Sequence, residues 1–197
     1  GSEMCIRDSK KTGIEITESA PHVSDSYAVP SYIGQGTNAY TTSQLARYAT
    51  AIATSGNVYD LTLLDRQTDS KGNTLKKYEP DIINTVDVSQ NVWDDIHDGM
   101  YRVVQTHRQF DGLGVDVAGK TGTAEVTVYH PNHGMFVGYA PASDPEYAIA
   151  VRIENGYTSG NACLAADDIF KYIFELTDEK SILTGVAASD TSDTSND

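Results

Sequence analysis

The chain has 197 residues, and its 14 basic and 28 acidic side chains give a formal net charge of −14. This length suits one domain, and the 39% of residues that are hydrophobic are enough for a real core. The negative charge argues against nucleic acid or an anionic membrane surface as a partner. No apolar run approaches the length of a membrane span, no signal peptide is visible, and the two cysteines do not indicate a disulfide scaffold.

The first nine residues read differently from the rest. Met4-Cys5-Ile6-Arg7-Asp8-Ser9 resembles a translated transposon end of the kind used to prepare sequencing libraries. We therefore interpret residues 1–9 as an adapter artefact, the alternative being an ordinary polar N-terminus. On this interpretation the biological chain begins near Lys10 or Lys11 and an upstream part has been lost.

A loop-rich segment, residues 10–40, contains the turn Gly34-Gln35-Gly36 and leads into the first predicted helix. Thr41 or Thr42 is placed to cap this helix, and Gly56 is placed to end it. Its apolar residues recur on one face, as expected of a helix that packs against a core.

An extended segment is predicted at 58–67, with a turn at 69–73 and a short return through Leu75. A second helix is predicted at 89–106, because Ser89 is a good N-cap and an apolar stripe follows. The residues of that stripe are Trp93, Ile96, Met100, Val103 and Val104.

Three strands are predicted in quick succession, at 117–129, 134–140 and 146–154. The links between them are short, which implies antiparallel pairing, since parallel neighbours need a long crossover. A last helix is predicted at 162–176, with Cys163 as a small buried residue. Its apolar positions are Ala162, Ala165, Ala166, Ile169, Phe170 and Ile173. The acidic segment 177–197 is predicted to be a disordered tail.

The segment Lys120-Thr121-Gly122-Thr123 carries the clearest chemistry. Lysine places a cation where an acidic ligand terminus can dock. Thr121 and Thr123 are two residues apart on a strand, so both hydroxyls point to the same face and can bind one carboxylate. Gly122 has no Cβ, which allows close approach of a ligand or of a facing backbone. The backbone N–H of Thr123 can serve as one donor of an oxyanion hole.

Several motifs occur in a fixed order along the chain. They are Ile33-Gly34-Gln35-Gly36 with Thr42 and Gln44-Leu45-Ala46, then Gly119-Lys120-Thr121-Gly122-Thr123-Ala124-Glu125, then Phe136-Val137-Gly138-Tyr139-Ala140-Pro141. Lys-Thr-Gly itself belongs to the serine acyl-transfer machinery of penicillin-binding proteins and class A β-lactamases. Over roughly residues 10–176, the ordered set resembles the C-terminal part of the transpeptidase domain of a class B penicillin-binding protein.

The resemblance implies an α/β fold of the transpeptidase and serine β-lactamase type, an antiparallel sheet flanked by helices that is incomplete here. It implies a peptidoglycan D,D-transpeptidase that cross-links stem peptides through a serine acyl-enzyme and that is acylated by β-lactams. Lys120 and Thr123 match its catalytic positions, and Thr121, Gly122 and Thr123 match its substrate-binding positions. No cofactor is implied. The parent is expected at the extracytoplasmic face of the bacterial membrane, anchored by a missing N-terminal segment, with cell-wall synthesis proteins as partners.

The nucleophile of that family is not in this chain, because none of the 197 residues begins a Ser-x-x-Lys motif. The family's Ser-x-Asn motif lies upstream of Gly-Gln-Gly, whereas the three such triplets here lie downstream. We interpret Ser55-Gly56-Asn57 as a helix C-cap, Ser89-Gln90-Asn91 as an N-cap and Ser159-Gly160-Asn161 as a loop. The fragment is therefore expected to be inactive alone.

Two other features, a pair of histidines and an acidic residue after the Lys-Thr-Gly motif, are weaker candidates for functional sites. His130 and His133 flank a turn without further ligands at metal spacing, so a solvated loop is the better interpretation and no metal is expected. Glu125 reads as a charge at a strand edge rather than a general base. Two alternative functions stay open: a non-catalytic binding or interaction module, and a serine β-lactamase or D,D-carboxypeptidase. The Gly-Gln-Gly segment and its spacing argue against the second.

Overall fold

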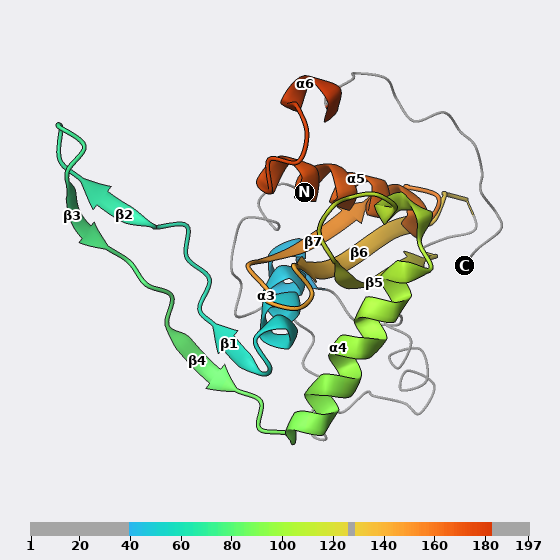
Figure 1. The fold of residues 1–197 in the computed structure, drawn as a ribbon, viewed down its shortest axis with the longest axis horizontal. Helices are drawn as coiled ribbons and strands as arrows, with labels where there is room; N and C mark the ends of the chain where they lie inside the picture. Colours follow the sequence, from blue (N-terminus) through green and yellow to red (C-terminus); the bar gives the residue numbers. More distant parts are fainter. Residues whose placement is uncertain (1–39, 126–128, 183–197) are drawn as a thin grey trace. The chain divides into compact units, whose positions relative to one another are not determined.

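The computed structural model describes residues 40–125 and 129–182 (Figure 1). The predicted adapter, the Gly-Gln-Gly segment and residues 183–197 lie outside this range. The described helices are α3 (Thr42–Ala53), α4 (Gln90–Gln105), the 3-10 helix η1 (Arg108–Phe110), α5 (Ser159–Ile173) and α6 (Glu179–Ile182). The described strands are β1 (Asn57–Tyr59), β2 (Arg66–Thr68), β3 (Thr74–Lys77), β4 (Ile82–Thr85), β5 (Ala118–Ala124), β6 (His133–Ala140) and β7 (Tyr147–Ile153).

The described residues form two compact units. The first comprises 40–45, 121–125, 129–136 and 150–182, and the second comprises 46–120 and 137–149. Strands β5, β6 and β7 are hydrogen-bonded in that order. Helices with antiparallel strands confirm the predicted α/β class.

The N-terminus of α3 is closed by a reciprocal capping box. The Gln44 N–H donates to Thr41 Oγ1 at 3.1 Å, and the Thr41 N–H donates to Gln44 Oε1 at 2.9 Å. Two of the four N–H groups at the helix start are thereby satisfied by local sequence. Of the two caps that the sequence allowed, the structure selects Thr41.

The C-terminus of α3 ends in a Schellman motif. The Ser55 N–H donates to the Ile52 carbonyl at 2.9 Å, and the Gly56 N–H donates to the Ala51 carbonyl at 2.7 Å. The left-handed residue of the motif is Ser55, with φ of 53°, and Gly56 follows with φ of 107°. The prediction that α3 ends at Ser55-Gly56-Asn57 is confirmed. Both Ser55 and Gly56 adopt a positive φ there.

The second unit has a small apolar core formed from α3, α4, β5 and β6. Its buried members are Ile52, Met100, Ala118 and Tyr139, with Ala53, Ile96, Ala142 and Ala148 packed around them. His97 joins α4 to the end of α3, because its Nε2 lies 2.8 Å from the Ile52 carbonyl. The His97 ring also meets Tyr139 edge-on, with centroids 5.9 Å apart.

Helix α4 agrees with its prediction. It begins after Ser89, although the Ser89 side chain makes no capping hydrogen bond. Of the predicted stripe, Trp93, Met100 and Val104 are buried, and Ile96 and Val103 are half-buried.

A long hairpin arm leaves the core of the second unit (Figure 1). β1 pairs antiparallel with β4, and β2 pairs antiparallel with β3. Every residue of β2, β3 and β4 is exposed, so hydrogen bonds rather than apolar burial hold the arm together. The prediction of one extended segment at 58–67 was wrong, since the strand breaks between Tyr59 and Arg66. Strand β4 was not predicted.

The tip of the arm is the predicted turn at 69–73. Asp69 Oδ1 accepts the N–H groups of Lys71 and Asn73 at 2.8 and 2.9 Å. The side-chain amide of Asn73 donates to Asp69 Oδ2, and these bonds lower the pKa of the Asp69 carboxyl. Gly72 supplies the left-handed residue, with φ of 85°.

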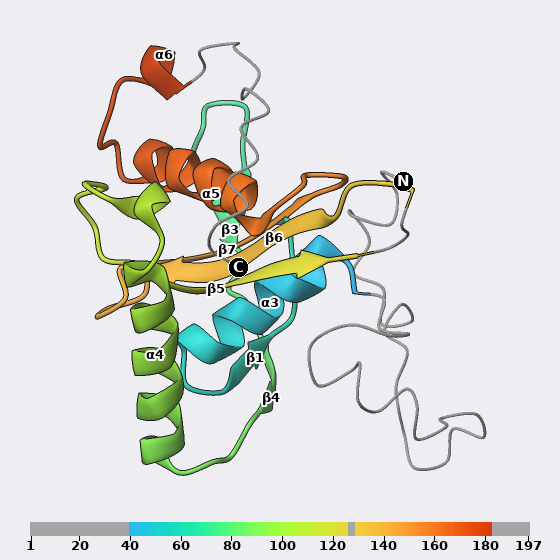
Figure 2. The ribbon, with the colours of Figure 1, turned by 90° about the vertical axis from the view of Figure 1, so that its right-hand side faces the viewer.

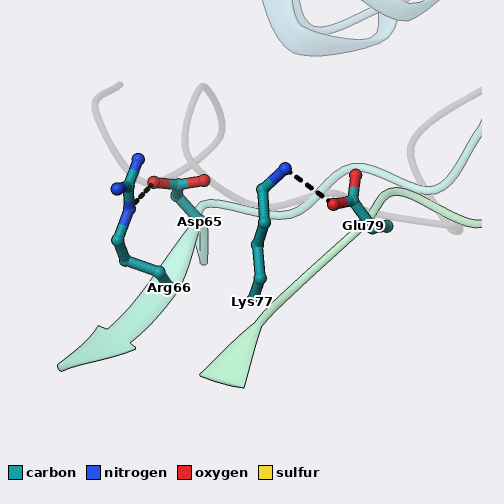
Figure 3. Close-up of polar contacts among 4 residues, drawn as sticks. All are labelled: Asp65, Arg66, Lys77 and Glu79. Atoms are coloured by element: carbon teal, nitrogen blue, oxygen red, sulfur yellow. Dashed lines mark hydrogen bonds and ion pairs between the residues drawn. The ribbon is translucent and has the colours of Figure 1, made fainter. Parts of the chain in front are cut away.

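Charged side chains balance one another on the arm (Figure 3). Arg66 on β2 lies directly opposite Lys77 on β3, a destabilising placement of like charges. Each cation has its own acid: Arg66 Nε lies 2.5 Å from Asp65, and Lys77 Nζ lies 2.7 Å from Glu79. The hydrogen bond to Glu79 raises the pKa of Lys77.

Helix α5 belongs to the first unit, beside parts of β6 and β7 (Figures 1 and 2). Its buried face comprises Ser159, Ala162, Cys163, Ala166, Asp167 and Phe170. Burial of Cys163 was predicted correctly. Ile169 was assigned to this face wrongly, since it is 38% exposed. The short helix α6 falls within the segment that the sequence predicts to be a disordered tail.

Candidate functional site

The segment Lys120-Thr121-Gly122-Thr123 lies on β5, at one end of the described strand order β5-β6-β7. The strand starts with the buried Ala118 and Gly119, and Lys120 is the first exposed residue. Thr121, Gly122 and Thr123 are half-buried. The alternation of a strand puts both threonines on one face, as the sequence predicts.

Strand β5 ends earlier than predicted. It stops at Ala124 rather than at residue 129, and Glu125 follows it as an exposed residue. Gly122 has room around it, because a Cβ there would meet only the Met135 Cβ, at an ordinary contact distance of 3.6 Å. The neighbouring strand therefore does not require glycine at position 122.

Thr123 contacts the first residue of α5. The Ser159 N–H donates to Thr123 Oγ1 at 3.2 Å, so a strand residue accepts from one of the N–H groups that a helix start leaves unpaired. Ser159 is 3% exposed, and the first turn of α5 carries no acidic residue. The partial positive charge of a helix N-terminus thus lies beside Thr123, which favours an anionic ligand there.

This contact corrects one prediction. Ser159-Gly160-Asn161 is the first turn of α5 and not a loop before it. The side-chain amide of Asn161 donates to the Gly156 carbonyl at 2.8 Å, and so joins this turn to the connection that precedes α5. The other two Ser-x-Asn triplets have the structural roles predicted for them, at the C-terminus of α3 and at the N-terminus of α4.

His133 is a residue that sequence reasoning missed. It was assigned to a solvated loop, but it is the first residue of β6, and its Nδ1 accepts the Asn155 N–H at 3.0 Å. His130 is exposed in the preceding turn. Across residues 40–125 and 129–182, no group of three or more potential ligands gathers in a metal-binding arrangement.

Comparison with known proteins decides the family. The model of the penicillin binding protein transpeptidase domain matches residues 8–175. The chain belongs to this family. The predicted class B penicillin-binding protein relationship and transpeptidase fold are confirmed.

Individual relatives agree with this assignment. The peptidoglycan D,D-transpeptidase MrdA of Acinetobacter baumannii is 33% identical over 159 residues, which is 71% of this chain and 23% of MrdA. The D,D-transpeptidase domain of a peptidoglycan glycosyltransferase from Eggerthella lenta is 32% identical with a TM-score of 0.61, covering 73% of this chain and 34% of that one. Penicillin-binding protein A of Mycobacterium tuberculosis, solved as a ceftriaxone acyl-enzyme, is 27% identical with a TM-score of 0.63, covering 74% and 34%.

The chain thus spans about a quarter of the length of the curated relatives. Among the described helices, none combines the length and the apolar character that a membrane crossing requires.

Proposed function

We propose that this chain supplies the carboxylate-docking wall of a serine D,D-transpeptidase. That enzyme cross-links peptidoglycan stem peptides through an acyl-enzyme and is acylated by β-lactams. The observation that carries the proposal is the Lys120–Thr123 segment of β5, with Thr123 Oγ1 bonded to the N-terminus of α5. Its support is the family membership, the D,D-transpeptidase names of the relatives, and the acyl-enzyme solved for one of them.

The local chemistry fits an acidic peptide terminus. Lys120 is an exposed cation, and a lysine ammonium attracts a carboxylate as a point charge. The hydroxyls of Thr121 and Thr123 lie on one face and can donate to the same carboxylate. Charge-assisted hydrogen bonds of this kind are stronger than neutral ones.

The roles then divide between binding and catalysis. Thr121, Gly122 and Thr123 bind substrate, and Lys120 attracts its carboxylate. Lys120 and the Thr123 backbone N–H also assist the reaction by stabilising charge that develops during acyl transfer. The nucleophilic serine is supplied by a part of the parent protein that this sequence does not contain, since no Ser-x-x-Lys occurs in it. We further propose that the parent acts at the extracytoplasmic face of the membrane together with the cell-wall synthesis machinery.

The test compares two ligands that differ only in charge. The ¹⁵N-labelled 197-residue chain is titrated with N-acetyl-D-alanyl-D-alanine and with its C-terminal amide, and binding is followed by NMR. We expect the acid to bind about tenfold more tightly, as one charge-assisted hydrogen bond of roughly 1.5 kcal/mol implies. Lys120→Ala should abolish that preference. Lys77→Ala, which removes another exposed lysine, on the arm, should leave it intact. Equal affinity for acid and amide in the unmodified chain would refute the proposal.

A further inference from the structure

Two consecutive residues of β6 contact the connection between β7 and α5. His133 Nδ1 accepts the Asn155 N–H at 3.0 Å. At the next residue, a Cβ added to Gly134 would lie 2.2 Å from the Thr158 carbonyl oxygen and 3.1 Å from its carbon. Both clashing atoms are backbone, so the connection passes directly against the bare glycine. Residue 134 must therefore be glycine if Thr158 is to keep its position.

The same connection is conformationally strained. Asn155 and Tyr157 have φ of 53° and 64°, in the left-handed region, which asparagine adopts fairly often but tyrosine seldom does. Tyr157 is 53% exposed, so burial of its ring does little to offset the backbone cost. A strained backbone of this kind persists only where its surroundings fix it. His133 and Gly134 are among the contacts that do so.

We propose that His133 and Gly134 are positioning residues for Thr123, acting through the β7–α5 connection. The inference rests on the proposed function, in which Thr123 binds the ligand carboxylate. Thr158 immediately precedes Ser159, whose N–H holds Thr123 Oγ1 at 3.2 Å. A hydroxyl oxygen that accepts from this N–H directs its own hydrogen away from α5. The ligand carboxylate receives that hydrogen, so the direction of the Thr123 hydroxyl depends on where the connection holds Ser159.

Substitutions can test the hydrogen-bond acceptor of His133 separately from the volume of its ring. The bond to Asn155 requires an unprotonated Nδ1, and the side-chain oxygen of asparagine lies at a similar distance from the backbone. His133→Asn therefore keeps an acceptor with less volume, whereas His133→Phe keeps a ring and removes the acceptor. His130→Phe is the matched control, because His130 is exposed in the turn that precedes β6.

The experiment follows two readouts on the ¹⁵N-labelled 197-residue chain. The first is the ratio of affinities for N-acetyl-D-alanyl-D-alanine and its amide. The second is the hydrogen-exchange rate of the Ser159 amide, which reports the bond to Thr123 directly. We expect His133→Phe and Gly134→Ala to lower the acid preference about fivefold and to speed Ser159 exchange about tenfold, since small misplacements of binding groups are costly. His133→Asn and His130→Phe should stay within about twofold of the unmodified chain.

The outcomes distinguish the inference from the function on which it rests. An unmodified chain without acid preference overturns the proposed function, and the positioning role for Thr123 falls with it. The second outcome is that the unmodified chain prefers the acid and His133→Phe retains both this preference and slow exchange of the Ser159 amide. That outcome overturns the positioning inference alone. If Gly134→Ala does not fold, the comparison of His133→Phe with His133→Asn decides the matter.

Discussion

Gly56 lies where the end of α3 meets two other segments of the second unit, and Gly56→Ala tests that packing. Its φ is 107°, a value that a side chain seldom tolerates. An added Cβ would lie 2.5 Å from the Val86 carbonyl oxygen and 2.9 Å from Trp93 Cζ2. The first of these atoms is backbone and the second belongs to a ring that is only 7% exposed, so neither can move away easily.

The expected cost has two parts. Forcing alanine into a positive φ costs about 1–2 kcal/mol, and overlap with packed atoms adds about 1–3 kcal/mol. The sum is a loss of about 2–5 kcal/mol from the free energy of unfolding. With a urea dependence of about 2 kcal/mol per molar, the unfolding midpoint should fall by roughly 1–2.5 M. Trp93 is the single tryptophan of the chain and touches the site, so its fluorescence is the natural probe.

Alanine substitutions at two other glycines serve as controls for this estimate. Gly112 also has a positive φ, of 76°, but a Cβ there would meet nothing within 4 Å, so Gly112→Ala measures the backbone part alone. Gly99 lies inside α4 with open space around it, and Gly99→Ala should stabilise the chain by up to about 1 kcal/mol through helix propensity. If Gly56→Ala costs no more than Gly112→Ala, the argument from close packing is refuted.

Four further predictions concern buried groups and acylation. Among the described residues the buried Tyr139 hydroxyl has no hydrogen-bond partner. Tyr139→Phe should therefore raise the free energy of unfolding, measured by urea titration, by about 1 kcal/mol. A lower free energy of unfolding in this variant would contradict the prediction. Burial also raises the pKa of Tyr139 to about 12 from 10, so the unmodified chain should lose stability between pH 10 and 12 and Tyr139→Phe should lack that loss. Burial raises the pKa of Asp167 despite its bond to Lys171. Asp167→Asn should therefore have the higher free energy of unfolding at pH 7, and the difference from the unmodified chain should vanish near pH 3. A difference in unfolding free energy that does not depend on pH would oppose this. A fluorescent penicillin should not label the 197-residue chain covalently, and stoichiometric acylation mapped to one of its serines would show that the nucleophile was misjudged.

Sequence alone predicted the elements whose ends are encoded locally. Thr41 and Gln44 cap α3 through hydrogen bonds between residues three positions apart. A pair so close in sequence can be recognised from a short stretch of the chain. The turn at 69–73 is likewise closed by Asp69 within its own five residues. The family could be predicted for a similar reason, because its motifs keep their order and spacing along the chain.

Elements stabilised by distant contacts could not be predicted in this way. Ser159-Gly160-Asn161 has the composition of a turn, yet it begins α5, where the Ser159 N–H meets a strand residue 36 positions earlier. His133 contacts Asn155 across 22 positions, and no local pattern indicates that pairing. The exposed strands of the arm lack the alternation of buried and exposed residues on which strand prediction depends.

Thr123 is where local and distant constraints meet, and this changes how its substitutions must be interpreted. Its hydroxyl is predicted to bind a ligand carboxylate, while the same oxygen accepts the first N–H of α5. Thr123→Val removes both interactions, so a loss of binding in that variant also contains a disturbed helix start. Thr123→Ser keeps both but frees the hydroxyl to rotate, because serine lacks the methyl group that restricts χ1. If binding requires the hydroxyl to be held by α5, Thr123→Ser should bind the acid more weakly than the unmodified chain yet more tightly than Thr123→Val. Equal binding by Thr123→Ser and the unmodified chain would mean that the hydroxyl alone suffices and that its orientation by α5 contributes nothing to affinity.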